Sequence, residues 1–215
     1  MKINSRVLAS ANIIFWDFDG VIKDSVDIKT EAYENLFQPY RPEIARRIRE
    51  HHEANGGVSR FDKIPLYLEW AGQSASPEQI EKCCQQFSQA VVQAVIDSPW
   101  VPGVRECLLK HYMDQYFVLV TATPQDEIEK ILCSLQLSHC FKEIFGAPTK
   151  KDRAIKEVLE RLKCSPDETF MIGDSESDLL AAQANSVRFL LRRTPRNGRL
   201  QATYQGPTFD DLNDE

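Results

Sequence analysis

A short apolar run that ends abruptly in acidic residues constrains the fold of this chain more than any other feature. Residues 13–16 are all apolar, and Asp17, Phe18, Asp19 and Gly20 follow at once. A continuous run rich in β-branched and aromatic residues is typical of a parallel strand that is buried on both faces. The sequence therefore predicts a buried strand that carries two carboxylates at its C-terminal end.

The same pattern recurs along the second half of the chain. Further apolar runs lie at 116–120, 143–145, 169–172 and 187–191. The stretches between them carry apolar residues at helical spacing, which is typical of helices that pack on a sheet. Because strands and helices alternate, we expect an α/β fold with a doubly wound parallel sheet.

The stretch between the first two strands breaks this alternation. Its pattern is helical throughout, with expected helices at 32–37, 42–52, 60–70 and 77–96. We therefore expect an all-helical cap domain at residues 24–99, inserted into a core domain made of residues 1–23 and 100–215. The polar tail after Gly198 is expected to be a loop that ends in a short C-terminal piece.

The charge and composition narrow the range of partners. The formal net charge of −6 gives no global field that would attract nucleic acid, and no window reaches the ~18 apolar residues of a membrane helix. We therefore expect no nucleic-acid or membrane partner; the oligomeric state stays open.

Six cysteines without a C-x-x-C pair suggest reduced thiols in a cytoplasmic protein. Arg192, Arg193 and Arg196 lie close together in the sequence, and the simplest expectation is that their side chains are exposed to solvent.

Polar residues gather where the expected strands end. Ligands of open parallel sheets bind outside the C-terminal ends of the strands. Those ends carry Asp17 and Asp19, then Thr121, Asp174 and the neighbouring Lys150 and Lys151. Grouped carboxylates repel one another unless a cation lies between them, and their hard oxygen atoms suit Mg²⁺. A metal, a lysine and a free carboxylate at one edge favour phosphoryl transfer.

Four motifs in this order resemble those of the haloacid dehalogenase-like phosphatases. The run from Asp17 to Ser25 is similar to the first motif, Thr121 to the second, the lysine after Thr149 to the third, and 173–178 to the fourth. Taken together, an ordered set of this kind is far more specific than a lone D-x-D. The resemblance implies a Mg²⁺-dependent phosphatase acting on a small phosphorylated metabolite, possible examples being sugar phosphates.

The resemblance also implies roles for the residues. Asp17 would attack phosphorus and form an aspartyl-phosphate, while Asp19 would act as general acid and base. Mg²⁺ would be held by the Asp17 and Asp174 side chains and the Asp19 backbone carbonyl. Thr121 and the lysine would bind phosphate oxygens, and Asp178 would orient the lysine or a metal-bound water. For the lysine, Lys151 is favoured over Lys150 because it lies four residues before the apolar helix face of Ile155.

The expected cap carries a second resemblance. Residues 56–60, which end in Arg60, are similar to a cap loop of β-phosphoglucomutase-like members, whose arginine holds a distal anionic group. Arg60 is thus either a ligand for a second phosphate or carboxylate, or a solvated arginine at a helix start. Lys63 either assists it or is exposed, and His51 and His52 are expected at the surface.

Two other functions stay open beside hydrolysis. Mutases of this subgroup usually carry a histidine ten residues after the second aspartate, where this chain has Lys29. Hydrolysis is therefore favoured over phosphosugar mutation. The third possibility is a domain that binds phosphorylated ligands as a sensor without turning them over.

Overall fold

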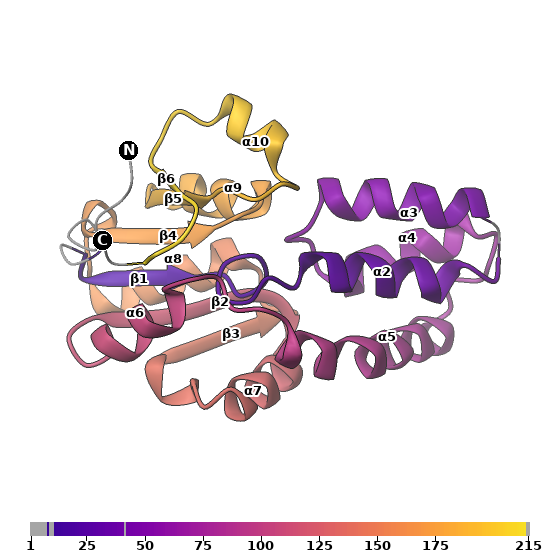
Figure 1. The fold of residues 1–215 in the computed structure, drawn as a ribbon, viewed down its shortest axis with the longest axis horizontal. Coiled ribbons are helices and arrows are strands. Elements are labelled where there is room, and N and C mark those ends of the chain that lie inside the picture. The colour runs from indigo at the N-terminus through magenta and orange to yellow at the C-terminus, as the bar shows by residue number, and fades with distance from the viewer. Residues whose placement is uncertain (1–7, 9–10, 41, 214–215) are drawn as a thin grey trace.

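A six-stranded parallel sheet forms the centre of the molecule (Figure 1). The structure is a computed structural model that describes residues 8, 11–40 and 42–213. The strands are β1 (Ile13–Trp16), β2 (Tyr116–Pro124), β3 (Glu143–Ala147), β4 (Thr169–Gly173), β5 (Arg188–Arg192) and β6 (Thr208–Phe209). Their order is β3-β2-β1-β4-β5-β6, and every neighbouring pair is parallel. The expected α/β class is confirmed.

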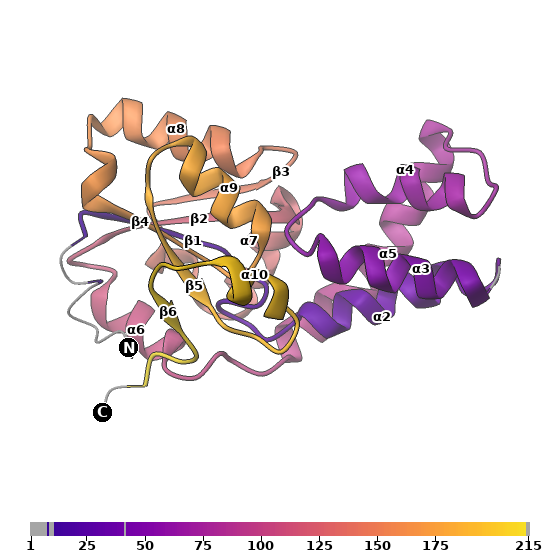
Figure 2. The same cartoon turned by 90° about the horizontal axis from the view of Figure 1, so that it is seen from above.

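Helices cover both faces of this sheet. They are α6 (Val104–His111), α7 (Gln125–Ser134), α8 (Lys151–Leu162), α9 (Glu176–Ala184) and α10 (Gly198–Thr203), with short 3-10 turns at Ser138–Cys140 and Pro166–Glu168. Figure 2 shows α8 on one side of the sheet and α6 on the other. Successive side chains of a strand point to opposite faces, so a strand covered twice must be apolar throughout.

The central strand shows this directly. Ile14 and Trp16 belong to the hydrophobic cluster that includes residues of α6 and α7. Ile13 and Phe15 belong to a second cluster, formed with α8 and α9. The apolar run therefore fixes β1 in the middle of the sheet, and the chain emerges from this packing only at Asp17.

Four helices between β1 and β2 lie beyond the C-terminal ends of the strands (Figure 1). These are α2 (Val26–Phe37), α3 (Pro42–Ala54), α4 (Arg60–Trp70) and α5 (Pro77–Asp97), called the cap helices below. Their apolar residues, such as Phe37 and Tyr67, are in one cluster with Phe18 and Ile22, which follow β1. Continuous apolar packing thus links the cap helices to the sheet.

Two expectations about the ends of elements need correction. β2 does not stop at Val120 but continues through Thr121 to Pro124, because after an irregularity the chain pairs with β3 again at Ala147. The tail expected as a loop folds into α10 and the two-residue strand β6. Among the described residues, no helix combines the length and apolar character needed to cross a membrane.

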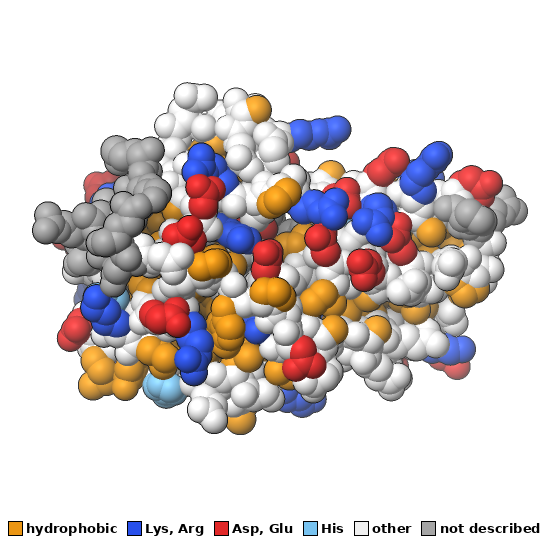
Figure 3. All heavy atoms as spheres, in the orientation of Figure 1, with side chains coloured by type: hydrophobic (Ala, Val, Ile, Leu, Met, Phe, Trp, Pro, Cys, Tyr) orange, Lys and Arg blue, Asp and Glu red, His pale blue; other side chains and the backbone are white. Residues whose placement is uncertain are grey.

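The three arginines near the end of β5 each meet a carboxylate. Arg192 pairs with Asp24 at 3.3 Å and donates to the backbone oxygen of Gly20 at 3.0 Å. It is buried, so the expectation that the whole cluster is solvated is wrong for Arg192. Arg193 pairs with Asp210, and Arg196 bridges from the core to Asp27 and Glu53 of the cap helices at 2.8 and 3.0 Å. On the face shown in Figure 3, acidic and basic side chains are interspersed.

Candidate active site

The polar residues expected at the strand ends come together at one edge of the sheet. Asp17 directly follows β1, Thr121 lies in the last part of β2, and Asp174 directly follows β4. Lys151 is the first residue of α8, and Asp178 lies in the first turn of α9. This convergence follows from the topology, because parallel strands all end at the same edge.

Lys151 joins two of the carboxylates. Its Nζ lies 2.9 Å from Oδ2 of Asp17 and 2.5 Å from Oδ1 of Asp178, and all three side chains are buried. Burial lowers the pKa of Lys151, but the charges of Asp17 and Asp178 outweigh that effect and raise it above its ordinary value. Lys150 is exposed at the start of α8, outside this group. The structure thus brings Lys151, and not Lys150, to the carboxylates.

Three buried carboxylates share a small space. One oxygen from each of Asp17, Asp174 and Asp178 lies within 4.8 Å of the others. Burial and the charge of Asp178 raise the pKa of Asp17 to about 7, although Lys151 opposes the shift. Burial and the charge of Asp17 likewise raise the pKa of Asp174 well above its usual range. Carboxylates that are costly to ionise together fit a site for a hard divalent cation, which removes that cost.

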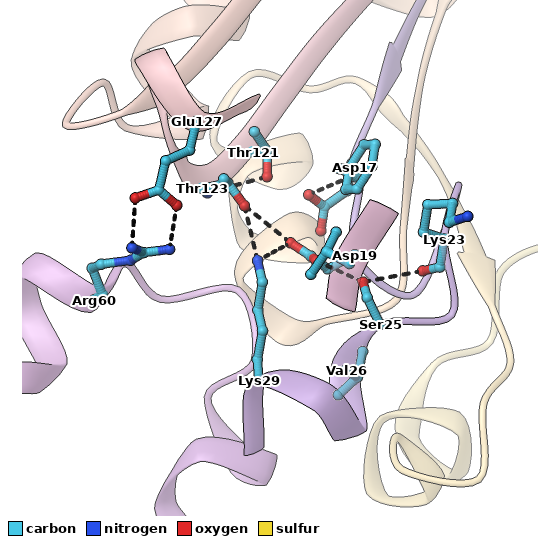
Figure 4. Close-up of polar contacts among 12 residues, drawn as sticks. Asp17, Asp19, Lys23, Ser25, Val26, Lys29, Arg60, Thr121, Thr123 and Glu127 are labelled. Atoms are coloured by element: carbon cyan, nitrogen blue, oxygen red, sulfur yellow. Dashed lines mark hydrogen bonds and ion pairs between the residues drawn. The ribbon is translucent and has the colours of Figure 1, made fainter. Parts of the chain in front are cut away.

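Asp19 is not one of these three carboxylates, and its side chain has its own partners (Figure 4). Lys29 of α2 forms an ion pair with Asp19 Oδ2, and Thr123 donates to the same oxygen at 3.2 Å. Ser25 donates to Oδ1 at 2.7 Å. Desolvation acts to raise the pKa of Asp19, but Lys29 and these hydrogen bonds outweigh it and hold the pKa below its usual value. The two aspartates of the first motif are therefore in opposite electrostatic environments.

Gly20 allows the acidic residues to approach so closely. Its φ is +73°, and a Cβ at this position would lie 2.1 Å from Oδ2 of Asp174. Only glycine meets both conditions without strain. The turn that follows β1 therefore places its backbone directly against the carboxylate that follows β4.

A cavity of about 50 Å³ lies between these residues and the cap helices. The core contributes Asp17, Asp19 and Asp174 to its lining, and the cap helices contribute Lys29 and His52 among others. Beside it, the cap loop at Gly57 lies against the start of α9, since a Cβ there would be 1.9 Å from Oγ of Ser177. The cap helices therefore close over the polar edge of the sheet.

Arg60 also lines the cavity, but its guanidinium is already paired. Nη1 and Nη2 donate to Oε1 and Oε2 of Glu127 in α7, each at 2.7 Å (Figure 4). Arg60 is 4% exposed, so the alternative of a solvated arginine at a helix start is wrong. The two parallel hydrogen bonds instead join the first turn of α4 to the core.

Several residues of this region were not expected from the sequence. Thr123 donates to Asp19 at 3.2 Å and accepts from Lys29 at 2.8 Å. Its position two residues after Thr121, on the same face of a strand, is the signal that could have found it. His52 was expected at the surface and is 2% exposed instead. Nothing in the local sequence indicates Glu127.

This arrangement defines a class of protein: a parallel α/β hydrolase with buried carboxylates and a lysine at the strand ends. The sequence matches the family haloacid dehalogenase-like hydrolase over residues 13–191, and the chain belongs to this family. The resemblance found in the four motifs is thus confirmed.

Curated relatives of the chain include phosphatases. The chain is 29% identical over 185 residues to a phosphorylated carbohydrates phosphatase from Thermotoga maritima, covering 81% of each chain. It is 26% identical over 184 residues to a phosphoglycolate phosphatase from Vibrio cholerae, covering 82% of this chain and 81% of the relative. Among solved structures, a putative beta-phosphoglucomutase from Thermotoga maritima shares the fold, with a TM-score of 0.66, 23% identity and 94% of each chain covered.

Proposed function

We propose that the chain is a Mg²⁺-dependent phosphatase that hydrolyses a small phosphorylated metabolite through an aspartyl-phosphate on Asp17. The observation that carries this proposal is the pairing of Asp17 with Lys151 inside a buried acidic group, while Asp19 is held separately by Lys29. One carboxylate is thus available for attack on phosphorus, and a second is available for proton transfer.

The donor set fits Mg²⁺ because it consists of carboxylate oxygens that repel one another without a cation. Asp17 and Asp174 would hold the ion with their side chains, and the family resemblance adds the backbone carbonyl of Asp19. Asp178 is bonded to Lys151 and accepts from Oγ of Ser175 at 2.6 Å, so we assign it the orienting role. When bound, Mg²⁺ neutralises negative charge on the phosphoryl oxygens.

Asp17 is oriented for attack by hydrogen bonds on both of its oxygens. Oδ1 accepts from the backbone N–H of Phe18 at 2.7 Å, and Oδ2 faces Lys151. In our proposal an Asp17 oxygen forms the bond to phosphorus as the bond to the leaving oxygen breaks. Lys151 and Thr121 bind the phosphoryl oxygens and stabilise their charge.

Asp19 carries the proton in our proposal, and Lys29 stays its ion-pair partner. Protonated Asp19 donates to the leaving oxygen in the first half of the reaction. In the second half, water forms a bond to phosphorus as the bond to Asp17 breaks, and ionised Asp19 accepts the proton of that water. The lowered pKa of Asp19 suits this second half, because the base must be ionised.

We assign the helical residues 24–99 the role of a cap domain that closes over the substrate. The cavity of about 50 Å³ supports a small substrate, since one water takes ~10–15 Å³ on the same measure. Closure excludes water and strengthens the electrostatic interactions within the site. The six free cysteines support a reducing compartment, and we propose the cytoplasm.

Release of phosphate from p-nitrophenyl phosphate, with and without Mg²⁺, tests this proposal. We expect activity that requires Mg²⁺ and is lost in Asp17→Asn, whereas Lys150→Ala, an exposed lysine beside the site, should stay active. Unchanged activity in Asp17→Asn would refute the assignment. An isomerised phosphosugar without net phosphate release would indicate a mutase, and ligand binding without turnover on a broad panel would indicate a sensor.

A further inference from the structure

A histidine and a lysine form a buried pair inside the cap helices. Nζ of Lys63 in α4 lies 2.8 Å from Nδ1 of His52 in α3. Lys63 is 1% exposed and His52 is 2% exposed. Tyr33 of α2 packs against the His52 ring, with the ring centroids 4.9 Å apart. Neither member of the pair contacts the reacting aspartates described above.

Each member of the pair lacks an interaction that a buried polar group usually has. Among the described residues, Nε2 of His52 is one of three buried side-chain polar atoms that lack a hydrogen-bond partner, and His52 lines the cavity. Lys63 forms no ion pair with a carboxylate of the described residues, although it is buried. A buried polar atom without a partner and a buried amine without a counterion are both costly, so a native structure rarely keeps them without a function.

The lysine and the arginine that line the cavity already have partners. Arg60 is held by Glu127 through both of its terminal nitrogens, and Lys29 is held by Asp19. The charge that faces Lys63 is mixed: Lys29 and Lys151 disfavour its ammonium form, and Asp19 and Asp62 favour it. Through His52, which lines the cavity, the His52–Lys63 pair therefore offers a donor group that the described residues leave unused.

We infer that the His52–Lys63 pair is a subsite for an anionic oxygen group, a carboxylate or a second phosphate, on the alcohol part of the substrate. The inference rests on the proposed function and adds to it which leaving groups the site selects. It also moves the recognition of a distal anion from Arg60, the residue suggested by the sequence, to two residues that the sequence pattern placed at the surface or left undecided.

The ammonium form of Lys63, which a bound anion favours, sets the direction of the hydrogen bonds in the ligand complex. An ammonium group has three donors and no acceptor, so in that form Nζ of Lys63 donates to Nδ1 of His52. The single proton of the neutral imidazole is then on Nε2, which donates to the ligand. Burial holds the pKa of Lys63 well below its ordinary value in the free protein. An anion bound at His52 favours the ammonium form, so ligand and lysine charge stabilise each other.

Three probes with the same two-carbon skeleton test the subsite. They are 2-phosphoglycolate, which carries a carboxylate, ethylene glycol bisphosphate, which carries a second phosphate, and the neutral 2-hydroxyethyl phosphate. We expect the wild type to prefer one anionic probe, and the preferred one identifies the anion. In His52→Phe and Lys63→Met, the ratio of kcat/KM for that probe to kcat/KM for the neutral probe should fall about tenfold to a hundredfold, as expected for a lost charge-assisted hydrogen bond.

Two further variants separate recognition from folding. His51 is the neighbouring histidine, its Nδ1 lies 3.0 Å from the hydroxyl of Tyr67, and it is not among the cavity-lining residues, so His51→Phe should leave the ratio unchanged. His52→Gln keeps an amide donor near the position of Nε2 and should restore part of the ratio. An unchanged ratio in His52→Phe and Lys63→Met, or an equal loss in His51→Phe, would overturn the subsite while leaving the phosphatase proposal intact.

A binding experiment separates failure of the subsite from failure of the proposed function. Calorimetry with Asp17→Asn and Mg²⁺ compares the affinities for the preferred anionic probe and for 2-hydroxyethyl phosphate without turnover. If wild type hydrolyses none of the probes, 2-phosphoglycolate serves as the anionic probe. Preference for the anionic probe that is lost on adding His52→Phe supports the subsite even in that case. If the His52 and Lys63 variants do not fold, NMR of the ¹⁵N nuclei of the His52 ring in Asp17→Asn tests the subsite instead. An Nε2 resonance that does not move on addition of the anionic probe overturns the inference.

Discussion

Arg60 and Glu127 form a two-pronged ion pair that joins the cap helices to the core. Both guanidinium nitrogens donate to the carboxylate at 2.7 Å, and both side chains are buried. The residues lie 67 positions apart in the sequence, one in α4 and one in α7. Because the pair joins α4 to α7, we predict that it acts as a clamp that stabilises the closed arrangement of the cap helices on the core.

The clamp predicts a characteristic pattern of substitutions. Removing one partner leaves the other charge buried and unpaired, which costs ~3–5 kcal/mol, whereas replacing both by apolar residues is often close to neutral. We expect Arg60→Met and Glu127→Leu each to lower kcat/KM strongly, and Arg60→Met/Glu127→Leu to recover much of the loss. Steady-state kinetics on one substrate measure this cycle. If the double variant is as impaired as Arg60→Met, Arg60 binds substrate and is not a clamp.

Two adjacent glycines provide a matched test of cap closure. A Cβ on Gly57 would lie 1.9 Å from Oγ of Ser177 and 2.4 Å from Oγ of Ser175, while a Cβ on Gly56 would meet nothing within 4 Å. Gly57→Ala should therefore hold the cap loop away from α9, at a cost of ~1–3 kcal/mol to the closed state. We expect roughly a tenfold fall in kcat/KM for Gly57→Ala. Gly56→Ala is the control, and an equal effect of both variants would count against closure at this contact.

Lys29 should control the pH dependence of turnover. Lys29 is the strongest influence that lowers the pKa of Asp19, so its removal leaves desolvation opposed only by the hydrogen bonds from Ser25 and Thr123 and raises that pKa. The step in which Asp19 accepts a proton from water requires the ionised form. In Lys29→Met the acidic limb of the pH–kcat profile should therefore move to higher pH, by about 1–3 pH units. Lys150→Met, an exposed lysine, should not move it; coincident profiles for Lys29→Met and wild type would contradict this role.

The acidic group predicts a pH-dependent stabilisation by Mg²⁺. The pKa of Asp17 is raised from 3.8 to about 7 in the folded chain. Between those values the metal-free folded state binds more protons than the unfolded state, so its unfolding free energy falls as pH rises. Mg²⁺ requires the ionised carboxylates, and its stabilising effect should grow across the same window.

Thermal unfolding with Mg²⁺ and with a chelator, at about pH 5 and about pH 7.5, measures this difference. We expect a larger increase in Tm from Mg²⁺ at the higher pH. In Asp174→Asn most of that increase should disappear. An increase that is equal at both pH values, or that is unaffected by Asp174→Asn, would argue against a metal bound by this acidic group.

The ends of β1 and β4 could be predicted from sequence because local pattern controls them. The apolar run before Asp17 is long enough only for a buried strand, and its abrupt end fixes where the polar residues emerge. The same holds for Asp174 after β4. Parallel topology then brings these ends together without any further information.

The cap side of the site could not be predicted in this way, since long-range contacts determine it. His52 has the sequence context of a polar helix end, and its burial depends on Tyr33 and Lys63 from two other helices. Arg60 lies in a segment that resembles a known cap loop, but its guanidinium is already paired with the carboxylate of Glu127 in α7. Local pattern indicates which residues are polar, while tertiary packing decides which of them remain available to a ligand.

The central claim is that Asp17 becomes phosphorylated during turnover. Wild-type protein mixed with p-nitrophenyl phosphate and Mg²⁺, quenched in acid within the first turnovers and digested, can be analysed by mass spectrometry. We predict a phosphoryl group on the peptide that contains Asp17, located on that residue and absent from Asp17→Asn, whose phosphate release should also be lost. Rapid phosphate release without phosphorylated Asp17, persisting in Asp17→Asn, would contradict the account.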